Sequence, residues 1–370
     1  MNFALTDEQE LLTEAARGAL SRVKTVEAAR EALDGGTLPD LWPTAIEAGW
    51  TGLLVGEERG GAGLGAIDAM LVFAELGRVL AGVPLLGHLP ASLLLDKAGH
   101  PVAEELASGS QRAAFVAAKP PSAIEPAWTA DPRGGLRRAP APSVGDDGTV
   151  DGDVGWVPDA PGADVLVVAG AEGRVALVQA ADASVEPVTG YDATRSLGHV
   201  RFSGASGELL DVTPSAAATA WYVAQGLVAA EAVGAIERAL ETSVDYAKER
   251  FTFGRAIGSY QAVKHELVEI LRRLENARSL MYYAGWAAAD KPEELPVAAS
   301  AFRLVAGEAY DHAARVQISV HGGIGATWEH EAPLFFRRAQ LDKRLLGGTG
   351  DAADRVADEL FAQAREAAAA

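Results

Sequence analysis

Two long helical patterns dominate residues 211–370 and determine what this part of the chain can form. The first begins at Pro214, a residue favoured in the first turn of a helix, and repeats apolar side chains at near-helical spacing as far as Arg250. The second covers about residues 261–289 and carries one apolar stripe, formed by Val263, Leu267, Ile270, Leu271 and Leu274. Further helices are predicted at about residues 294–319 and 352–368.

The rest of the chain divides into a helical and a β-rich part. Alanine and leucine recur at three- and four-residue spacings from Thr6 to about residue 112, and Thr6 with Gln9 forms a capping-box pattern. Short β-branched runs at residues 164–170 and 174–180 predict a small antiparallel β unit. The predicted fold class is α+β, mainly α. We expect an N-terminal helical domain, a central β domain and a C-terminal helical domain at residues 1–112, 113–210 and 211–370.

Composition excludes several kinds of partner and site. The formal charge of −19 at pH 7 argues against nucleic acid or an anionic membrane as the default partner, because both would repel the surface. The absence of cysteine excludes a disulfide framework, a thiolate nucleophile and a cysteine metal site, and we expect no metal. The acidic N-terminus does not resemble a secretion signal, and no apolar run approaches bilayer-spanning length. We therefore expect a soluble, cytoplasmic protein.

A first candidate binding cluster lies between the two long helices. Arg250 and Thr252 end the first helix, Phe253 begins a turn with a glycine, and Gln261 opens the second helix. A guanidinium fork suits phosphate oxygens, and a helix N-terminus adds partial positive charge, so this turn can bind one anion. A cation that satisfies the last carbonyls of a helix would give the same pattern for an isolated Arg250.

A second candidate cluster follows the helix predicted to end near residue 319. Gly322 and Gly323 remove side chains where a planar or phosphate-bearing ligand could approach the backbone. Paired glycines are more often a plain turn between helices. His321 before them is, taken alone, more often a satisfied polar residue than a catalyst.

In this order and at this distance, the two clusters resemble the acyl-CoA dehydrogenase family. An R-x-x-F-G turn followed by a glutamine, and later an H-G-G-x-G stretch, form part of the FAD site there. The resemblance extends along the chain through residues 1–12, 49–87, 157–169 and 191–202. It implies an N-terminal helical domain, a central β domain and a C-terminal four-helix bundle. It also implies FAD as cofactor and an acyl-CoA thioester as substrate, with an electron-transfer acceptor as partner.

The family reaction is α,β-dehydrogenation. A carboxylate removes the α-proton of the thioester while the β-hydride passes to the flavin. The adenine-side half of FAD is held across a subunit boundary by the R-x-x-F-G turn of the neighbouring chain. The residues that would carry this contact here are Arg250, Thr252, Phe253, Gln261, Gly322 and Gly323.

The chain departs from the family at the base. Alignment of its final segment places Leu346 or Gly347 where a glutamate commonly precedes Gly-Thr. Some members carry the base on the first bundle helix, and counting back from Phe253 brings that position to about Ala224. None of these side chains accepts a proton. Glu231 and Asp351 are the nearest acids in the sequence, and Asp351 is the fallback base.

The part of the β domain that binds the flavin in family members also differs from the family pattern. Family members usually carry T-E-P and then G-S-D after the first strand, and residues 121–142 retain only Glu125 and Pro126. Trp156 with Val157 is the candidate substitute for the aromatic and threonine that cover the flavin ring in family members. The chain thus keeps the residues that, in family members, contact the FAD of the neighbouring subunit. It lacks the residues that bind FAD within the same subunit.

The resemblance points to a subunit without a catalytic residue, paired in an α2β2 complex with a homologous subunit that brings the base. Heteromeric members of this kind act in actinobacterial degradation of sterols and related acyl-CoA thioesters. Three alternatives remain open: a self-sufficient homo-oligomeric dehydrogenase with a displaced carboxylate, a flavin-dependent monooxygenase, and an inert structural homologue.

Overall fold

The computed structural model describes residues 4–117, 129–130, 138–139, 141–170 and 173–369. The N-terminal part is helical, as predicted. Thr6 caps the first helix: its side chain accepts the Gln9 N–H at 3.3 Å, and the Gln9 side chain accepts the Thr6 N–H at 3.1 Å. The helices of this part are α1 (Asp7–Leu20), α2 (Thr25–Leu33), α3 (Trp42–Glu47), α4 (Ala66–Arg78), α5 (Leu85–Lys97) and α6 (Val102–Ser108), with short 3-10 turns at Trp50–Gly52 and Glu57–Arg59.

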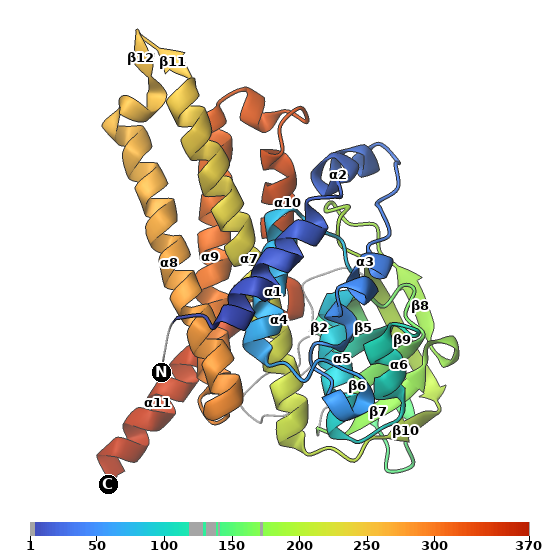
Figure 1. Cartoon of the computed structure of the whole chain (residues 1–370). Coiled ribbons are helices and arrows are strands. Elements are labelled where there is room, and N and C mark those ends of the chain that lie inside the picture. Colours follow the sequence, from blue (N-terminus) through green and yellow to red (C-terminus); the bar gives the residue numbers. More distant parts are fainter. Residues whose placement is uncertain (1–3, 118–128, 131–137, 140, 171–172, 370) are drawn as a thin grey trace.

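Two four-stranded sheets form the central part (Figure 1). One has the order β1-β6-β7-β10, and the other has the order β4-β5-β9-β8. Alternate residues of β1 face opposite sides: Ala114 and Val116 pack against the second sheet, whereas Phe115 joins the helical core. The strands are β1 (Ala113–Ala117), β4 (Ser143–Val144), β5 (Val150–Pro158), β6 (Val165–Ala169), β7 (Val175–Gln179), β8 (Ser184–Pro187), β9 (Leu197–Ala205) and β10 (Gly207–Leu209), beside a short pair β2 (Thr129–Ala130) and β3 (Arg138–Ala139).

The prediction of an antiparallel β unit is wrong at one pair of strands. Strands β1 and β6 pair in parallel, with Ala113 opposite Val165 and Ala117 opposite Ala169. Parallel neighbours need a long crossover connection. Here the chain passes through β4 and β5 of the other sheet before it returns as β6, so both strands enter the sheet from the same end.

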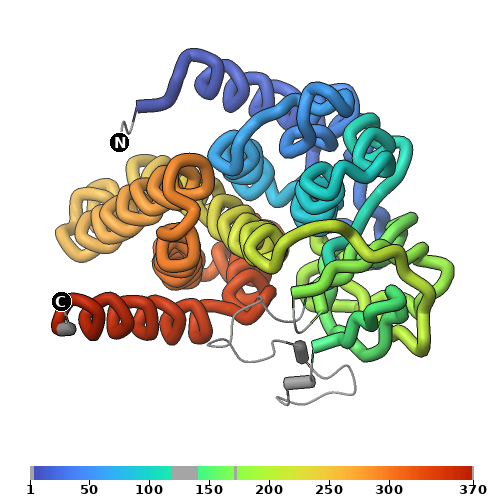
Figure 2. The backbone as a smooth tube through the Cα atoms, turned by 90° about the horizontal axis from the view of Figure 1, so that it is seen from below, coloured from blue at the N-terminus to red at the C-terminus, as the bar shows by residue number. Residues whose placement is uncertain are grey.

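The C-terminal part is built from α7 (Pro214–Glu249), α8 (Gln261–Asp290), α9 (Leu295–His321), α10 (Ala332–Asp342) and α11 (Gly348–Ala369). Three of the four predicted helices match within two residues, and α11 begins four residues earlier than expected. The pattern did not predict α10. Figure 2 shows the bundle between the N-terminal helices and α11. Among the described residues, no helix is long and apolar enough to cross a lipid bilayer.

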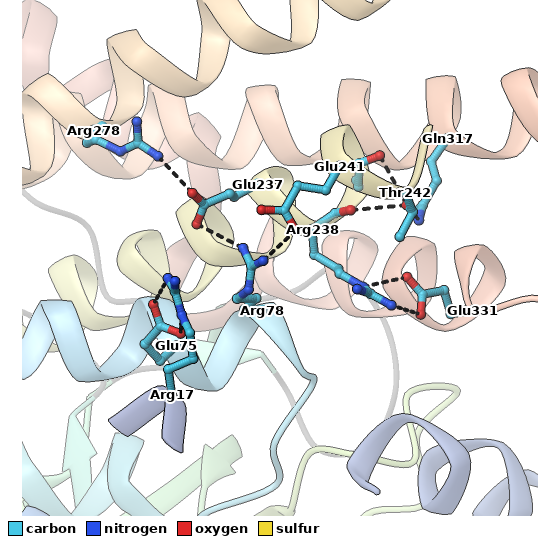
Figure 3. Close-up of polar contacts among 11 residues, drawn as sticks. Arg17, Glu75, Arg78, Glu237, Arg238, Glu241, Thr242, Arg278, Gln317 and Glu331 are labelled. Carbon is cyan, nitrogen blue, oxygen red and sulfur yellow. Dashed lines mark hydrogen bonds and ion pairs between the residues drawn. The ribbon is translucent and has the colours of Figure 1, made fainter. Parts of the chain in front are cut away.

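The N-terminal part docks on α7 through two glycines. A Cβ at Gly77 of α4 would lie 1.9 Å from the Glu231 carbonyl oxygen, and one at Gly234 of α7 would lie 1.7 Å from the Ala74 carbonyl oxygen. The two helix backbones are therefore in direct contact. Figure 3 shows the ion pairs beside this crossing, where Arg78 of α4 contacts Glu237 and Glu241 of α7.

Candidate functional site

The first predicted cluster forms a hairpin at the free end of the bundle (Figure 1). Arg250 caps the C-terminus of α7, and strands β11 (Phe251–Thr252) and β12 (Arg255–Ala256) follow. Phe253 and Gly254 form the two-residue turn, with φ of 50° and 79°, which is the type I′ pattern. Phe253 is 94% exposed. Its positive φ is unfavourable for a bulky side chain. Arg250 and Gln261 are exposed, and the Thr252 carbonyl accepts the Tyr260 hydroxyl at 3.2 Å.

The second predicted cluster is the turn that ends α9. Gly322 has φ 63° and ψ −137°, a conformation that requires glycine. Gly323 has ordinary helical angles, so its backbone does not explain the missing side chain. A Cβ at either position would meet nothing within 4 Å. The backbone of this turn, called here the di-glycine turn, is open to an approaching group.

The chemistry of the two clusters fits a dinucleotide phosphate. Arg250 supplies an exposed cation. The N-terminus of α8, which no side chain of the described residues caps, supplies backbone N–H groups beginning at Gln261, and the di-glycine turn supplies open backbone. Contacts between the ends of α7 and α9 hold the clusters at one end of the bundle: the Tyr246 and His321 rings lie 4.5 Å apart. The roles of the six predicted FAD contacts remain predictions.

The two segments that carry the alternative positions of the base are in contact. The side-chain amide of Gln225, next to Ala224 on α7, donates to the Leu346 carbonyl at 2.5 Å. Ala224 is buried, and Leu346 has φ 47° in the 3-10 turn Leu345–Gly347 that precedes α11. The hydrogen bond from Gln225 therefore joins the two segments to which the alignments point.

The fallback base lies close to this place. Asp351 is a buried residue in the first turn of α11. One turn later, the Arg355 guanidinium lies 5.7 Å from the ring of Tyr222, which precedes Gln225 by three residues on α7. Asp351 and Arg355 share one face of α11, because residues four apart are neighbours on a helix. Asp351 thus lies on the face of α11 that Arg355 turns toward α7.

Glu231, the other acid near these positions, belongs to a buried ionic cluster. Its carboxylate, 2% exposed, accepts hydrogen bonds from Arg195 and Arg338. Arg338 also donates to Asp192 at 2.6 Å, and Arg195 lies 3.4 Å from Asp342. With Arg303, which donates to the Leu345 carbonyl at 3.0 Å, the ionic cluster holds three guanidiniums and three carboxyl groups. Two guanidiniums already bind Glu231, so its geometry is that of a structural anchor.

Burial and neighbouring charges set the protonation of this cluster. Burial alone would raise the pKa of Asp192, but Arg338 and Thr194 hold it below its ordinary value. Burial, reinforced by Glu231, raises the pKa of Asp342 to about 7. The cluster joins the loop before β9 to α7, α9 and α10, and through Arg303 it fixes the segment that leads to Leu346.

In the β domain, Trp156 lies in an irregularity of β5 with φ 61° and 38% of its surface exposed. Its ring packs edge-on against His199, at 5.0 Å between centroids, and Val157 is buried. Glu125 and Pro126, the remnant of the flavin-seat motif, lie outside the described residues.

Residues 6–113 match the N-terminal domain of acyl-CoA dehydrogenase, and residues 215–360 match its C-terminal domain. The acyl-CoA dehydrogenase IpdE2 of Mycobacterium tuberculosis is 35% identical over 361 residues, which cover 96% of this chain and 98% of that protein. The chain belongs to the acyl-CoA dehydrogenase family. The acyl-CoA dehydrogenase architecture accounts for the order of helices, sheets and helices.

One further relative and one solved structure are similar to this chain over nearly its whole length. FadE34 of Mycobacterium tuberculosis is 32% identical over 364 residues, which are 95% of this chain but 47% of FadE34. A chain in the crystal structure of the ChsE4-ChsE5 complex from the same organism superposes with a TM-score of 0.81 at 25% identity, covering 98% of this chain and 99% of that one.

Sequence patterns did not reveal the ionic cluster. One of its arginines was visible as a single cation in apolar surroundings: Arg303 follows Phe302 on α9, whereas Arg338 lies beside Arg337 in the charged run that forms α10. A cation on the apolar stripe of a helix signals a buried partner, because an unpaired buried charge is very costly.

Proposed function

We propose that this chain is the subunit without a base in an FAD-dependent acyl-CoA dehydrogenase of α2β2 composition. The observation that carries the proposal is the contact between Gln225 and the Leu346 carbonyl. It supports the proposal because neither an amide group nor a backbone carbonyl can remove an α-proton. The proposed substrate is an acyl-CoA thioester, in fatty-acid or sterol degradation, and the proposed partner is a homologous subunit with a glutamate base. A cytoplasmic location is part of the proposal.

The proposed task of this chain is to hold the phosphates of FAD seated mainly on the partner. Arg250 would pair with pyrophosphate oxygens, and the di-glycine turn would let the backbone approach them. FAD, when bound, supplies the hydride acceptor. The exposed side chains Phe251 and Phe253, 63% and 94% exposed, support a surface that another subunit covers.

The relatives support the two-subunit arrangement. The ChsE4-ChsE5 structure is a complex of two different chains, and FadE34 is about twice as long as its match to this chain. The ChsE4-ChsE5 complex is the one that supports a second, different subunit beside this chain. A homologous partner would complement the missing base here.

Replacement of Arg250 by alanine in the assembled complex tests the proposal. Loss of this charge-assisted contact should weaken FAD binding by roughly 1.5–3 kcal/mol, or about 10- to 150-fold. Arg315→Ala is the control, because Arg315 pairs with Asp311 on the same helix bundle, away from both clusters. Unchanged FAD affinity in Arg250→Ala would refute the proposed role.

A further inference from the structure

Three aromatic rings connect the two parts of the proposed phosphate site. The ring of His321, the last residue of α9, lies 4.5 Å from Tyr246 of α7 and 4.1 Å from His330 in the segment before α10. His321 is 5% exposed. These residues are called here the ring stack, and they join three segments that are distant in the sequence.

Hydrogen bonds fix the two imidazoles of the ring stack. The Nδ1 of His321 lies 2.8 Å from the Gln317 carbonyl, which only accepts, so this nitrogen carries the proton. The Nδ1 of His330 accepts the Ala332 N–H at 3.1 Å, so this nitrogen is bare. Burial lowers the pKa of His330, and the neighbouring His321 adds to the effect. The hydrogen bond from Ala332 fixes the orientation of the His330 ring, and its surroundings favour the neutral form.

The ring stack borders both proposed phosphate contacts. The Tyr246 carbonyl accepts the Arg250 N–H at 2.8 Å, one turn further along α7. His321 directly precedes the di-glycine turn. Two polar contacts continue the connection along α7, as Figure 3 shows: Thr242 accepts from Gln317 at 2.9 Å, and Arg238 binds Glu331 through two bonds of 2.9 Å.

We infer that His321 is a positioning residue for the proposed phosphate site. Its flat ring sets the distance between the turn of Arg250 and the di-glycine turn, so that both reach the same diphosphate group. This inference rests on the proposed function. An aliphatic side chain of similar volume would lack the two ring contacts and would let the turns shift, whereas phenylalanine would keep an aromatic ring between Tyr246 and His330.

The inference predicts a graded effect on FAD affinity in the complex with the homologous partner. His321→Leu should weaken FAD binding about tenfold, and His321→Phe should stay within about threefold of the wild type. His312→Leu, the same change on α9 outside the ring stack, is the matched control and should have no effect. Tyr246→Leu removes the other end of the stack and should reproduce His321→Leu, which keeps the test decisive where His321→Leu does not fold.

A double-mutant cycle separates positioning from general stability. In a chain that already carries Arg250→Ala, the alignment of the two turns no longer serves the Arg250 contact. His321→Leu should therefore weaken FAD binding by less than about threefold in that background. Additive losses, or equal losses in His321→Leu and His312→Leu, would overturn the inference while the proposed function stands. An unchanged FAD affinity in Arg250→Ala would remove the proposed function and this inference with it.

Discussion

Replacement of Glu231 by glutamine distinguishes a structural acid from a catalytic one. Glu231 lies on α7, seven residues after Ala224, and accepts from both Arg195 and Arg338 in the buried ionic cluster. Glutamine keeps the shape of the side chain but removes its charge. Among the described residues, Arg195 and Arg338 then keep ion pairs with Asp342 and Asp192, respectively.

The structure sets the magnitude of the effect. Removal of one partner from a buried ion pair costs about 3–5 kcal/mol of stability. Two features place the loss of stability in Glu231→Gln near the lower end of this range. Glutamine retains one acceptor oxygen, and the negative charge of Glu231 is one cause of the raised pKa of Asp342. Without that charge, Asp342 ionises at lower pH and offers compensating charge to Arg195, so we expect a loss of about 3 kcal/mol.

Urea unfolding followed by tryptophan fluorescence measures this loss. Asp153→Asn is the control, because Asp153 pairs with Arg201 at the surface and should change stability by less than about 1 kcal/mol. A loss below about 1 kcal/mol in Glu231→Gln, together with a fall of about 100- to 10,000-fold in the rate of proton abstraction, would refute the structural assignment and identify Glu231 as the base.

Three other substitutions have expected outcomes of their own. The native state holds the proton of Asp342 up to about pH 7, whereas the unfolded chain releases it near 3.8, so rising pH destabilises the wild type between these values. The free energy of unfolding of Asp342→Asn relative to the wild type should therefore rise from pH 5 to 7, by at most about 1.4 kcal/mol per pH unit, and level off above pH 7. A difference in urea unfolding that does not change with pH contradicts this. Gly234→Ala should lower the free energy of unfolding by about 3 kcal/mol, because its Cβ would overlap the Ala74 carbonyl. Gly18→Ala, with open space around its Cβ, should raise the free energy of unfolding by about 0.5–1 kcal/mol. Equal shifts of the two melting temperatures would argue against the close helix crossing. Asp351→Asn should leave the rate of proton abstraction in the complex within about threefold of the wild type, and a fall of 100-fold or more in stopped-flow flavin reduction would make Asp351 the base.

The sequence predicted the long helices well because their signals are local. Pro214 begins α7, and the capping box of Thr6 opens α1, as expected. The helix α10 was not predicted because Arg338 and Asp342 place charges on its buried face. Their partners are distant in the sequence: Asp192 is 146 residues before Arg338. A periodicity argument assigns such side chains to solvent.

The candidate site was predictable in part for the same reason. Arg250 and Gly322 lie in turns that local motifs reveal. The contact between Gln225 and Leu346 spans 121 residues, and only the folded chain brings them together. The parallel pairing of β1 with β6 likewise depends on the path of the chain between them, which strand propensity does not report.

The central claim is that this chain contributes to a flavin site without forming a complete one. The visible spectrum of the purified protein tests it most directly, first with the chain alone and then after co-expression with a homologue that carries a glutamate base. We predict a colourless or weakly coloured protein without acyl-CoA oxidation alone, and a yellow, active heterotetramer with the partner, whose activity is lost when the partner's glutamate is replaced. A yellow homo-oligomer of this chain that oxidises acyl-CoA by itself would contradict the account.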